Sequence, residues 1–217
     1  MHGWGWRGGT VFLCTLLLCA CATLPRPASV PMPWSQHLAA LQGIAQFDLQ
    51  GRLAAATGTE GFSAGLRWHQ QDDRASIDLS APLGFGAAHI EQSAVDLQLT
   101  TSKGQVLDSA AASDELRATL GFEPPLTSLR YWILGASDPK TRALESLDPE
   151  QRLAHLEQDG WQVDYADYVL VQQQWLPRRL SVTRGDLRLR VVIDHRRTAM
   201  PASASERLRV GMPIAPV

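Results

Sequence analysis

Cysteine is almost absent from this sequence. Its three cysteines lie at positions 14, 19 and 21, and none follows. The body of the chain can therefore form neither a disulfide scaffold nor a cysteine-ligated zinc site. An excess of basic residues is also lacking, because 20 Lys and Arg stand against 22 Asp and Glu. Without a basic field to neutralise phosphates, we expect no nucleic-acid partner.

The N-terminus has the pattern of a targeting segment. Arg7 is the only charged residue before an almost unbroken apolar run, Thr10–Leu18, which is far shorter than the roughly 20 residues of a membrane-spanning helix. The run ends in the sequence LCAC, residues 18–21, which resembles a bacterial lipobox. This pattern predicts that residues 1–20 are a lipoprotein signal peptide and that Cys21 is lipidated and begins the mature chain.

The residues after the lipobox favour a location at the outer membrane. In lipoprotein sorting, an aspartate at the second mature position commonly retains the protein at the inner membrane, and this chain has Ala22 there. Thr23–Pro33 contains four prolines and has no helical or strand period, so residues 21–33 are interpreted as a lipidated N-terminus and flexible tether. A lipid anchor there would hold the domain on the periplasmic side of the outer membrane of a Gram-negative bacterium. The alternative is an ordinary secretory signal cleaved near Ala22.

The hydrophobic pattern of residues 34–195 predicts one domain that is mainly β. Apolar residues first repeat with helical spacing from Trp34 to Ala45 and then alternate with polar residues in short segments. These segments lie at residues 47–55, 62–68, 75–79, 88–90, 95–99, 161–165, 180–182 and 187–193. Tight turns between successive segments favour an antiparallel meander. About ten or eleven strands in one sheet should curl into a full or partial barrel.

The middle and the end of the chain lack this alternation. Cap residues and apolar spacing predict two short helices, at 113–121 and 126–134. Residues 138–149 are expected to form a polar loop. From residue 196 the period is lost among Ala, Ser, Pro and Arg, which predicts a disordered C-terminal tail over 196–217.

No catalytic centre is indicated. Gly61–Gly65 fits the G-x-S-x-G pattern of a serine hydrolase, but that motif needs a strand, a strained turn and a helix. The strand alternation runs through it to Trp68, so Ser63 is expected on a strand. A lipid esterase that uses Ser63 remains an alternative that a Ser63→Ala variant would test. The histidines after the signal show no ligand spacing, so we expect no metal; they are His37, His69, His89, His155 and His195.

An apolar turn follows the third predicted strand. In the sequence APLGFG, residues 81–86, proline stops the strand and two glycines permit a tight reversal. Leu83 and Phe85 would then lie at a tip that is normally polar. Either the tip folds back onto the core, or it touches a membrane or another protein. Burying one such side chain contributes roughly 1.5–3 kcal/mol, enough for reversible contact but not for anchoring.

Taken together, these segments resemble a known family, the outer-membrane lipoprotein receptor LolB, from Trp34 to about Asp194. The resemblance rests on the order and spacing of Phe47–Ala54, Leu66–Trp68, Pro82–Gly84, Leu129–Gly135, Gln158–Tyr168 and Leu176–Leu180. Two features depart from the family. It often has a tryptophan near the end of the last strand, where this chain has His195, and residues 196–217 have no counterpart in it.

The resemblance implies both a fold and a function. The fold is an unclosed antiparallel β-barrel of about 11 strands that is covered by short helices and encloses an apolar cavity. Family members receive acylated lipoproteins from a soluble, LolA-like periplasmic carrier and insert them into the outer membrane, with no nucleotide, metal or other cofactor. The exposed leucine of the tip, Leu83 here, acts in membrane insertion, with Pro82, Gly84 and Phe85 as its support. We expect a monomer.

An acyl-chain cavity would need apolar walls, because exposing about three chains to water costs tens of kcal/mol at ~0.8 kcal/mol per methylene. The candidate wall residues are Phe47, Leu49, Phe62, Leu66, Trp68, Ile77 and Leu79 on the sheet, with Trp132 and Ile133 on a covering helix. A solid hydrophobic core would require the same apolar side chains. The alternative is therefore a membrane-anchored structural or protein-docking lipoprotein with a solid core.

Overall fold

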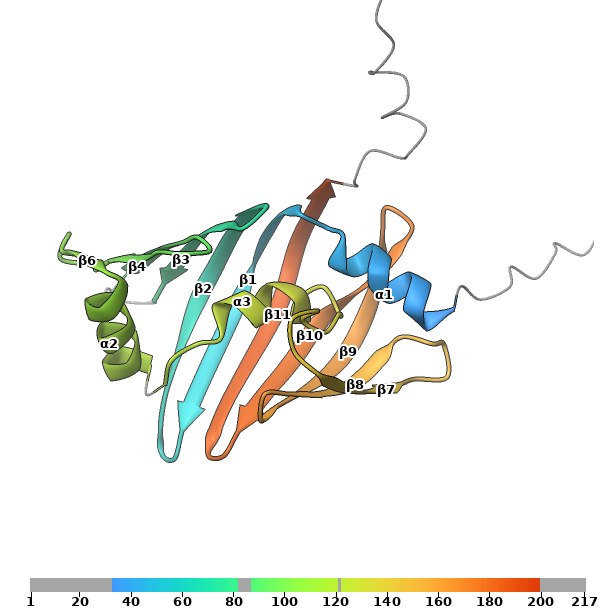
Figure 1. Cartoon of the computed structure of the whole chain (residues 1–217). Helices are drawn as coiled ribbons and strands as arrows, with labels where there is room; N and C mark the ends of the chain where they lie inside the picture. Colours follow the sequence, from blue (N-terminus) through green and yellow to red (C-terminus); the bar gives the residue numbers. More distant parts are fainter. Residues whose placement is uncertain (1–32, 82–86, 121, 200–217) are drawn as a thin grey trace, which may run out of the picture. The chain divides into compact units, whose positions relative to one another are not determined.

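The computed structural model describes residues 33–81, 87–120 and 122–199. Within them, one antiparallel sheet of eleven strands is accompanied by three helices (Figure 1), which confirms the mainly β fold class. The chain divides into two compact units, Met1–Pro31 and Met32–Val217, and every described helix and strand belongs to the second. No helix in the described part is both long and apolar enough to cross a membrane.

Two meanders build the sheet. Its strands are β1 (Gln46–Thr57), β2 (Glu60–Gln71), β3 (Arg74–Ser80), β4 (Ala87–Gln92), β5 (Leu97–Thr100), β6 (Val106–Asp108), β7 (Ala143–Leu147), β8 (Leu153–Gln158), β9 (Trp161–Val171), β10 (Gln174–Arg184) and β11 (Leu187–Ala199). Their spatial order is β6-β5-β4-β3-β2-β1-β11-β10-β9-β8-β7. The first and last strands therefore pair at the centre and join the two meanders, while β6 and β7 form separate edges. The sheet is curved and unclosed.

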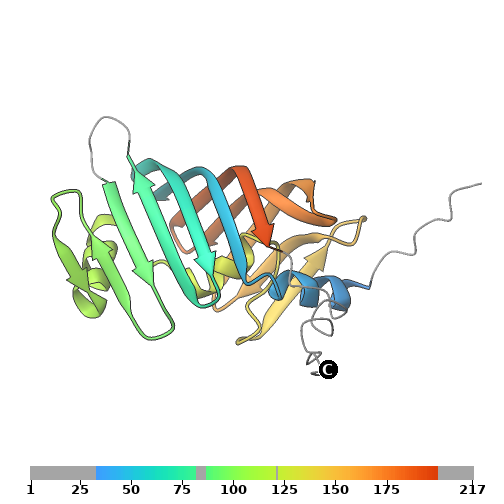
Figure 2. The ribbon, with the colours of Figure 1, turned by 90° about the horizontal axis from the view of Figure 1, so that it is seen from above.

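Three helices lie on one face of this sheet, called the inner face from here on. They are α1 (Trp34–Gln42), α2 (Ser109–Leu120) and α3 (Leu126–Trp132). Figure 1 shows α3 crossing in front of β1 and β11, with α1 and α2 toward the two sides, and Figure 2 gives the view from above. Leu41, Leu116 and Trp132 from the three helices join one core cluster with the inward residues of the strands. The helices thus cover apolar strand positions that would otherwise face water.

The alternation of buried and exposed residues along the strands shows which side chains form the core. In β1, Phe47 and Leu49 are buried while their neighbours in sequence are exposed, as expected for a strand with one solvated face. The register between β1 and β11 shifts at Gly51, where β11 holds one extra residue. A Cβ at Gly51 would lie 2.1 Å from the carbonyl oxygen of Val192. Glycine is therefore required where the two central strands approach most closely.

The strand register also defines one end of the sheet. The β1–β2 turn after Thr57 and the β10–β11 turn after Arg184 lie at the same end, because Thr57 pairs with Leu187 and Arg184 also pairs with Leu187. The β3 strand runs toward this end but stops earlier, since Ser80 pairs with Gly65, which pairs with Arg52 near the middle of β1. We call this the turn end of the sheet.

Both predicted helices in the middle of the chain have different bounds in the structure. The first begins at Ser109, four residues before the expected start, because Ala110–Ala112 are strong helix formers that extend it backwards. The second ends at Trp132 rather than at residue 134, and Gly135 follows with a φ of 78°. That left-handed conformation ends the helical path and favours glycine.

Three strand predictions were wrong in detail. The 138–149 segment is not only a loop, because it contains β7, an edge strand whose pattern is inverted: Leu144 is exposed and Glu145 is partly covered. The β5 strand starts at Leu97, and Val95 is 93% exposed in the turn before it. The predicted tail boundary at residue 196 was also wrong, since β11 continues to Ala199 through its pairing with β1. The ordered domain therefore extends beyond residue 195.

Candidate functional site

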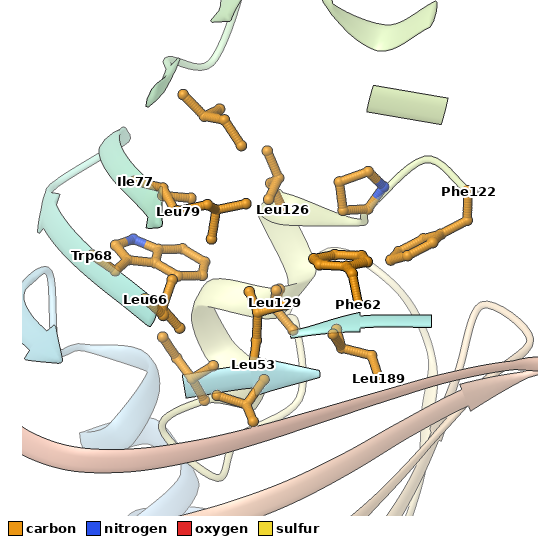
Figure 3. Close-up of a pocket in the computed structure, with 14 residues that line it drawn as sticks. Leu53, Phe62, Leu66, Trp68, Ile77, Leu79, Phe122, Leu126, Leu129 and Leu189 are labelled. Atoms are coloured by element: carbon orange, nitrogen blue, oxygen red, sulfur yellow. The ribbon is translucent and has the colours of Figure 1, made fainter. Parts of the chain in front are cut away.

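An apolar pocket lies between the inner face of the sheet and α3. Six of the nine predicted wall residues line it: Phe62, Leu66, Trp68, Ile77, Leu79 and Ile133. Figure 3 shows side chains pointing into it from the strands on one side and from α3 on the other. All of its lining residues are apolar in character. In this conformation the free volume is about 50 Å³, room for only a few water molecules at roughly 10–15 Å³ each.

The other three predicted residues are elsewhere in the core. Phe47 and Leu49 are each 2% exposed near the start of β1, away from the turn end, and the Phe47 ring packs against Trp68 at 6.0 Å between centroids. Trp132 is fully buried in α3, and its ring lies 6.1 Å from that of Trp161. These three residues therefore lie outside the pocket. They fill space between elements instead of lining the pocket.

Residues that the sequence analysis did not assign to the cavity complete the wall. They are Leu53, Ile90, Phe122, Pro124, Leu126, Leu129, Leu189 and Val191. Cross-strand pairing places several of them side by side, because Leu53 pairs with Val191 and Ala55 pairs with both Phe62 and Leu189. On α3, Leu126 and Leu129 share a face with Ile133 at helical spacing. That spacing was the sequence signal that could have identified them.

Directed polar contacts hold the C-terminal end of α3. The indole nitrogen of Trp132 donates to Gln158 Oε1 on β8 at 2.9 Å, and this glutamine is only 2% exposed. The carbonyl oxygen of Ile133, just after the helix, accepts a hydrogen bond of 2.6 Å from the Arg196 guanidinium on β11. Beyond it, a Cβ at Gly135 would lie 3.1 Å from Pro177. This end of the helix is therefore fixed to β8, β10 and β11.

Around this attachment, several ionisable side chains are removed from water. Burial lowers the pKa of the Arg196 guanidinium to about 9, which still leaves it charged at neutral pH. Its Nε has no hydrogen-bond partner within the described part of the chain. Burial also raises the pKa of the Tyr165 and Tyr168 hydroxyls well above the usual value. The Tyr168 hydroxyl donates to the carbonyl oxygen of Leu153 at 2.5 Å, whereas the Tyr165 hydroxyl has no partner among the described residues.

Apolar packing dominates at the N-terminal end of α3. Phe122 and Pro124 precede the helix and form part of the pocket wall, and Leu126 begins it. Two polar contacts come from the middle of the helix: Arg130 pairs with the largely exposed Asp73 of the β2–β3 turn at 3.2 Å, and the Ser128 hydroxyl donates to Asp138 at 2.9 Å. An ion pair with an exposed partner contributes little, typically under about 1 kcal/mol. The two ends of α3 are thus held unequally, and the weaker end lies over the pocket.

The esterase motif does not have the geometry that catalysis needs. Gly61–Gly65 lies within β2, paired along its length with β1, and the strand continues to Gln71 with no helix after the serine. Ser63 pairs with Ala54 and is exposed on the outer face of the sheet. A nucleophile elbow requires a strand-to-helix turn, so Ser63 is an ordinary strand residue.

Three of the histidines have acidic partners across strands, which sequence spacing did not indicate. His69 lies 2.6 Å from Asp48, and His155 lies 2.7 Å from Asp164. His89 contacts both Asp78 and Glu91, and these hydrogen bonds raise its pKa. No group of three or more His, Cys, Asp or Glu within the described ranges could hold a metal ion. Cys21 and the tip residues Pro82, Leu83, Gly84 and Phe85 lie outside the described residues.

Comparison with known proteins identifies the family. Residues 45–195 match the model of the family described as "Outer membrane lipoprotein LolB". The chain belongs to the LolB family. The LolB protein of Alkalilimnicola ehrlichii is 38% identical over 185 residues, covering 83% of this chain and 92% of the relative. That of Nitrosococcus oceani is 34% identical over 193 residues, covering 87% and 96%.

A solved structure with a different sequence shares the architecture. A DUF1329-family protein from Desulfovibrio piger superposes with a TM-score of 0.53 at 7% identity, covering 79% of this chain and 93% of that protein. At this identity the likeness concerns the fold alone. The assignment to the LolB family rests on the sequence matches alone.

Proposed function

We propose that this chain receives lipoproteins from a LolA-like periplasmic carrier, shelters their acyl chains beneath α3 and inserts them into the outer membrane. The observation that carries this proposal is the apolar pocket between α3 and the inner face of the sheet. A lipid in transit needs such a surface, because each methylene exposed to water costs about 0.8 kcal/mol. The chain acts as a monomer, with the pocket formed by one copy.

The pocket must open before an acyl chain can enter, because 50 Å³ holds only a few waters at roughly 10–15 Å³ each. The unequal attachment of α3 supplies a direction for this opening. The Trp132–Gln158 and Ile133–Arg196 contacts hold its C-terminal end, while apolar side chains close the other end. Swinging the N-terminal end outward exposes apolar surface, and an acyl chain that enters covers it again.

Cys21 carries the lipid anchor in this proposal, and the 82–86 segment contacts the bilayer during insertion. Supporting the second role, β3 ends at Ser80 and β4 begins at Ala87, on the side of the sheet toward the turn end. A Leu83→Glu variant should still accept lipoproteins from the carrier but should fail to release them into membranes. The matched control is Val95→Glu, which changes another apolar residue, 93% exposed in the turn before β5.

The direct test is transfer of a labelled lipoprotein from a purified carrier to liposomes, with and without this protein. Transfer that depends on the protein, is lost in Leu83→Glu and survives in Val95→Glu supports the proposal. Insertion by Leu83→Glu at the normal rate removes the tip from the mechanism. Palmitate labelling of the chain tests the anchor separately, and a Cys21→Ala variant should take up no label.

The small volume of the pocket also favours a second candidate, a lipid-anchored protein that docks a partner and has a filled core. The two candidates differ in their response to a probe that fluoresces in apolar pockets. A lipoprotein receptor should bind such a probe in competition with a fatty acid. A filled core should leave the fluorescence at the level of the free probe.

A further inference from the structure

Among the described residues, Arg188 and Arg190 on β11 form no ion pair and face no acidic residue on the neighbouring strands. Arg188 and Arg190 alternate with Leu187, Leu189 and Val191, which are buried in the core. Both arginines are therefore exposed on the outer face of the sheet, which faces away from the helices. Within the described part of the chain, neither takes part in an ion pair or a side-chain hydrogen bond.

The neighbouring strands offer these arginines only small, uncharged side chains. Arg190 pairs with Ala54 on β1 and Ser181 on β10. Arg188 pairs with Ala56 and Thr183 in the same way. Because side chains that pair across strands lie about 5 Å apart, a charged neighbour at any of these positions could have neutralised an arginine.

Other arginines on the outer face are placed differently. Arg52 and Arg179 form ion pairs with Asp194 and Asp167, at 3.2 and 2.8 Å. Two more lie opposite an aspartate in the strand register, since Arg67 pairs with Asp78 and Arg197 pairs with Asp48. Arg188 and Arg190 differ from these four because, among the described residues, they have neither an ion pair nor an aspartate opposite them in the strand register.

The small neighbours also leave a groove beside the two arginines. It has about 260 Å³ of free space and is lined by Ala54, Ala56, Ser181 and Thr183 together with both arginines. A guanidinium presents several N–H donors in a plane that matches the oxygens of a phosphate group. Two such groups at one open groove therefore suit a phosphate that reaches the sheet from solvent.

The groove lies near the turn end of the sheet. Arg188 is the second residue of β11, directly after the turn, and Arg190 follows two residues later. Three strands away from β11, β3 ends at Ser80 and β4 begins at Ala87, both on the side of this same end of the sheet. A bilayer in contact with the turn end would therefore bring its headgroups close to both arginines.

We propose that Arg188 and Arg190 form a binding surface for the phosphate groups of anionic phospholipids, which orients the domain on the membrane. This inference rests on the proposed insertion function and adds the surface that recognises the acceptor bilayer. One basic residue near an anionic membrane strengthens binding about fivefold, so the pair should contribute roughly 20- to 30-fold. High salt should remove most of this contribution, because the Debye length falls from about 10 Å at 0.1 M to about 3 Å at 1 M.

The test is sedimentation of the compact unit Met32–Val217, which carries the whole described core and no lipid anchor, with sucrose-loaded vesicles. The vesicles are pure phosphatidylcholine or contain 30 mol% phosphatidylglycerol, and no client lipoprotein is present. An Arg188→Gln/Arg190→Gln variant is compared with the wild type. Its control, Arg67→Gln/Arg197→Gln, removes the same charge from the same face, and circular dichroism checks the fold of each variant.

The wild type and the control should bind anionic vesicles at least tenfold more tightly than neutral ones, and the Arg188→Gln/Arg190→Gln variant should lose this preference. Equal loss in both variants would overturn the assignment of the site, because net charge alone would then explain binding. A wild type that binds neutral and anionic vesicles equally well would overturn it too. So would release of the protein from the vesicles by 10 mM inorganic phosphate at constant ionic strength, because the site would then bind free phosphate. Since no lipoprotein is transferred, failure here leaves the transfer assay to judge the proposed function independently.

Discussion

The indole nitrogen of Trp132 and the side-chain oxygen of Gln158 form a buried hydrogen bond of 2.9 Å that joins α3 to β8. The same oxygen accepts a hydrogen bond from the backbone nitrogen of Asp138, and the Gln158 amide donates to the carbonyl oxygens of Asp138 and Thr141. One glutamine therefore satisfies polar groups from the helix and from the segment that follows it. It fixes the end of α3 about which we expect the helix to swing.

Replacing this glutamine should destabilise the domain. A Gln158→Leu variant leaves the Trp132 indole and the Asp138 backbone groups without partners in a buried site, and each orphaned group costs about 1–3 kcal/mol. We expect a loss of about 3 kcal/mol in the free energy of unfolding, measured by urea titration. The control is Gln162→Leu, because Gln162 is exposed on β9. Equal stability of the two variants would show that the Gln158 contacts do not matter.

The two buried tyrosines should respond differently to loss of their hydroxyls. Tyr168→Phe removes the hydrogen bond to Leu153 and should cost about 1 kcal/mol. Tyr165→Phe removes a hydroxyl that is buried without a partner among the described residues, so it should leave stability unchanged or slightly higher. Urea titration of both variants checks the order. A larger loss for Tyr165→Phe than for Tyr168→Phe would contradict the expected order.

Alkaline pH should weaken the folded state through the same tyrosines. Burial raises their pKa in the folded protein, whereas both ionise near pH 10 when unfolded. Above pH 10 the unfolded chain therefore loses protons that the folded chain keeps, and stability falls as pH rises. The Tyr165→Phe/Tyr168→Phe variant should lose less stability between pH 9 and 11 than the wild type. Parallel curves for the two proteins would contradict the assignment.

Enlarging the pocket should cost stability but improve probe binding. Leu129→Ala opens space in the pocket wall, and Leu156→Ala opens it in a part of the core away from the pocket. Both should lose about 2–4 kcal/mol in the free energy of unfolding. Only Leu129→Ala should bind an apolar fluorescent probe more tightly, roughly fourfold for each additional methylene accommodated. An equal gain in both variants would place the probe outside the pocket.

The fold could be predicted from the sequence wherever one side of an element is apolar. The alternation from Phe47 to Ala55 predicted β1, and the helical spacing from Trp34 predicted α1, because burial of one face determines both patterns. The β7 strand was missed for the opposite reason. Its Leu144 faces water and its Glu145 faces inward, where it accepts a hydrogen bond from the Trp34 indole across 111 residues of sequence. No local pattern encodes such a partner.

The candidate site was predictable only in part. Phe62 and Leu66 line the pocket, because inward strand residues must face the helices. Phe47 and Leu49 satisfy the same alternation but lie farther along β1, away from the pocket. Whether an inward residue packs against a neighbour or borders free space depends on where α3 crosses the sheet. Strand periodicity carries no information on that crossing.

The central claim is that acyl chains lie between α3 and the sheet during transfer. The most direct measurement is photocrosslinking to a lipoprotein with labelled acyl chains, using benzoylphenylalanine in place of Phe62, a half-buried residue of the pocket wall. The same group in place of Ser63 is the control, because that adjacent residue faces the outside of the sheet. The account predicts an adduct on the acyl chains at position 62 and none at position 63. Equal labelling at both positions, or labelling at 63 alone, would contradict it.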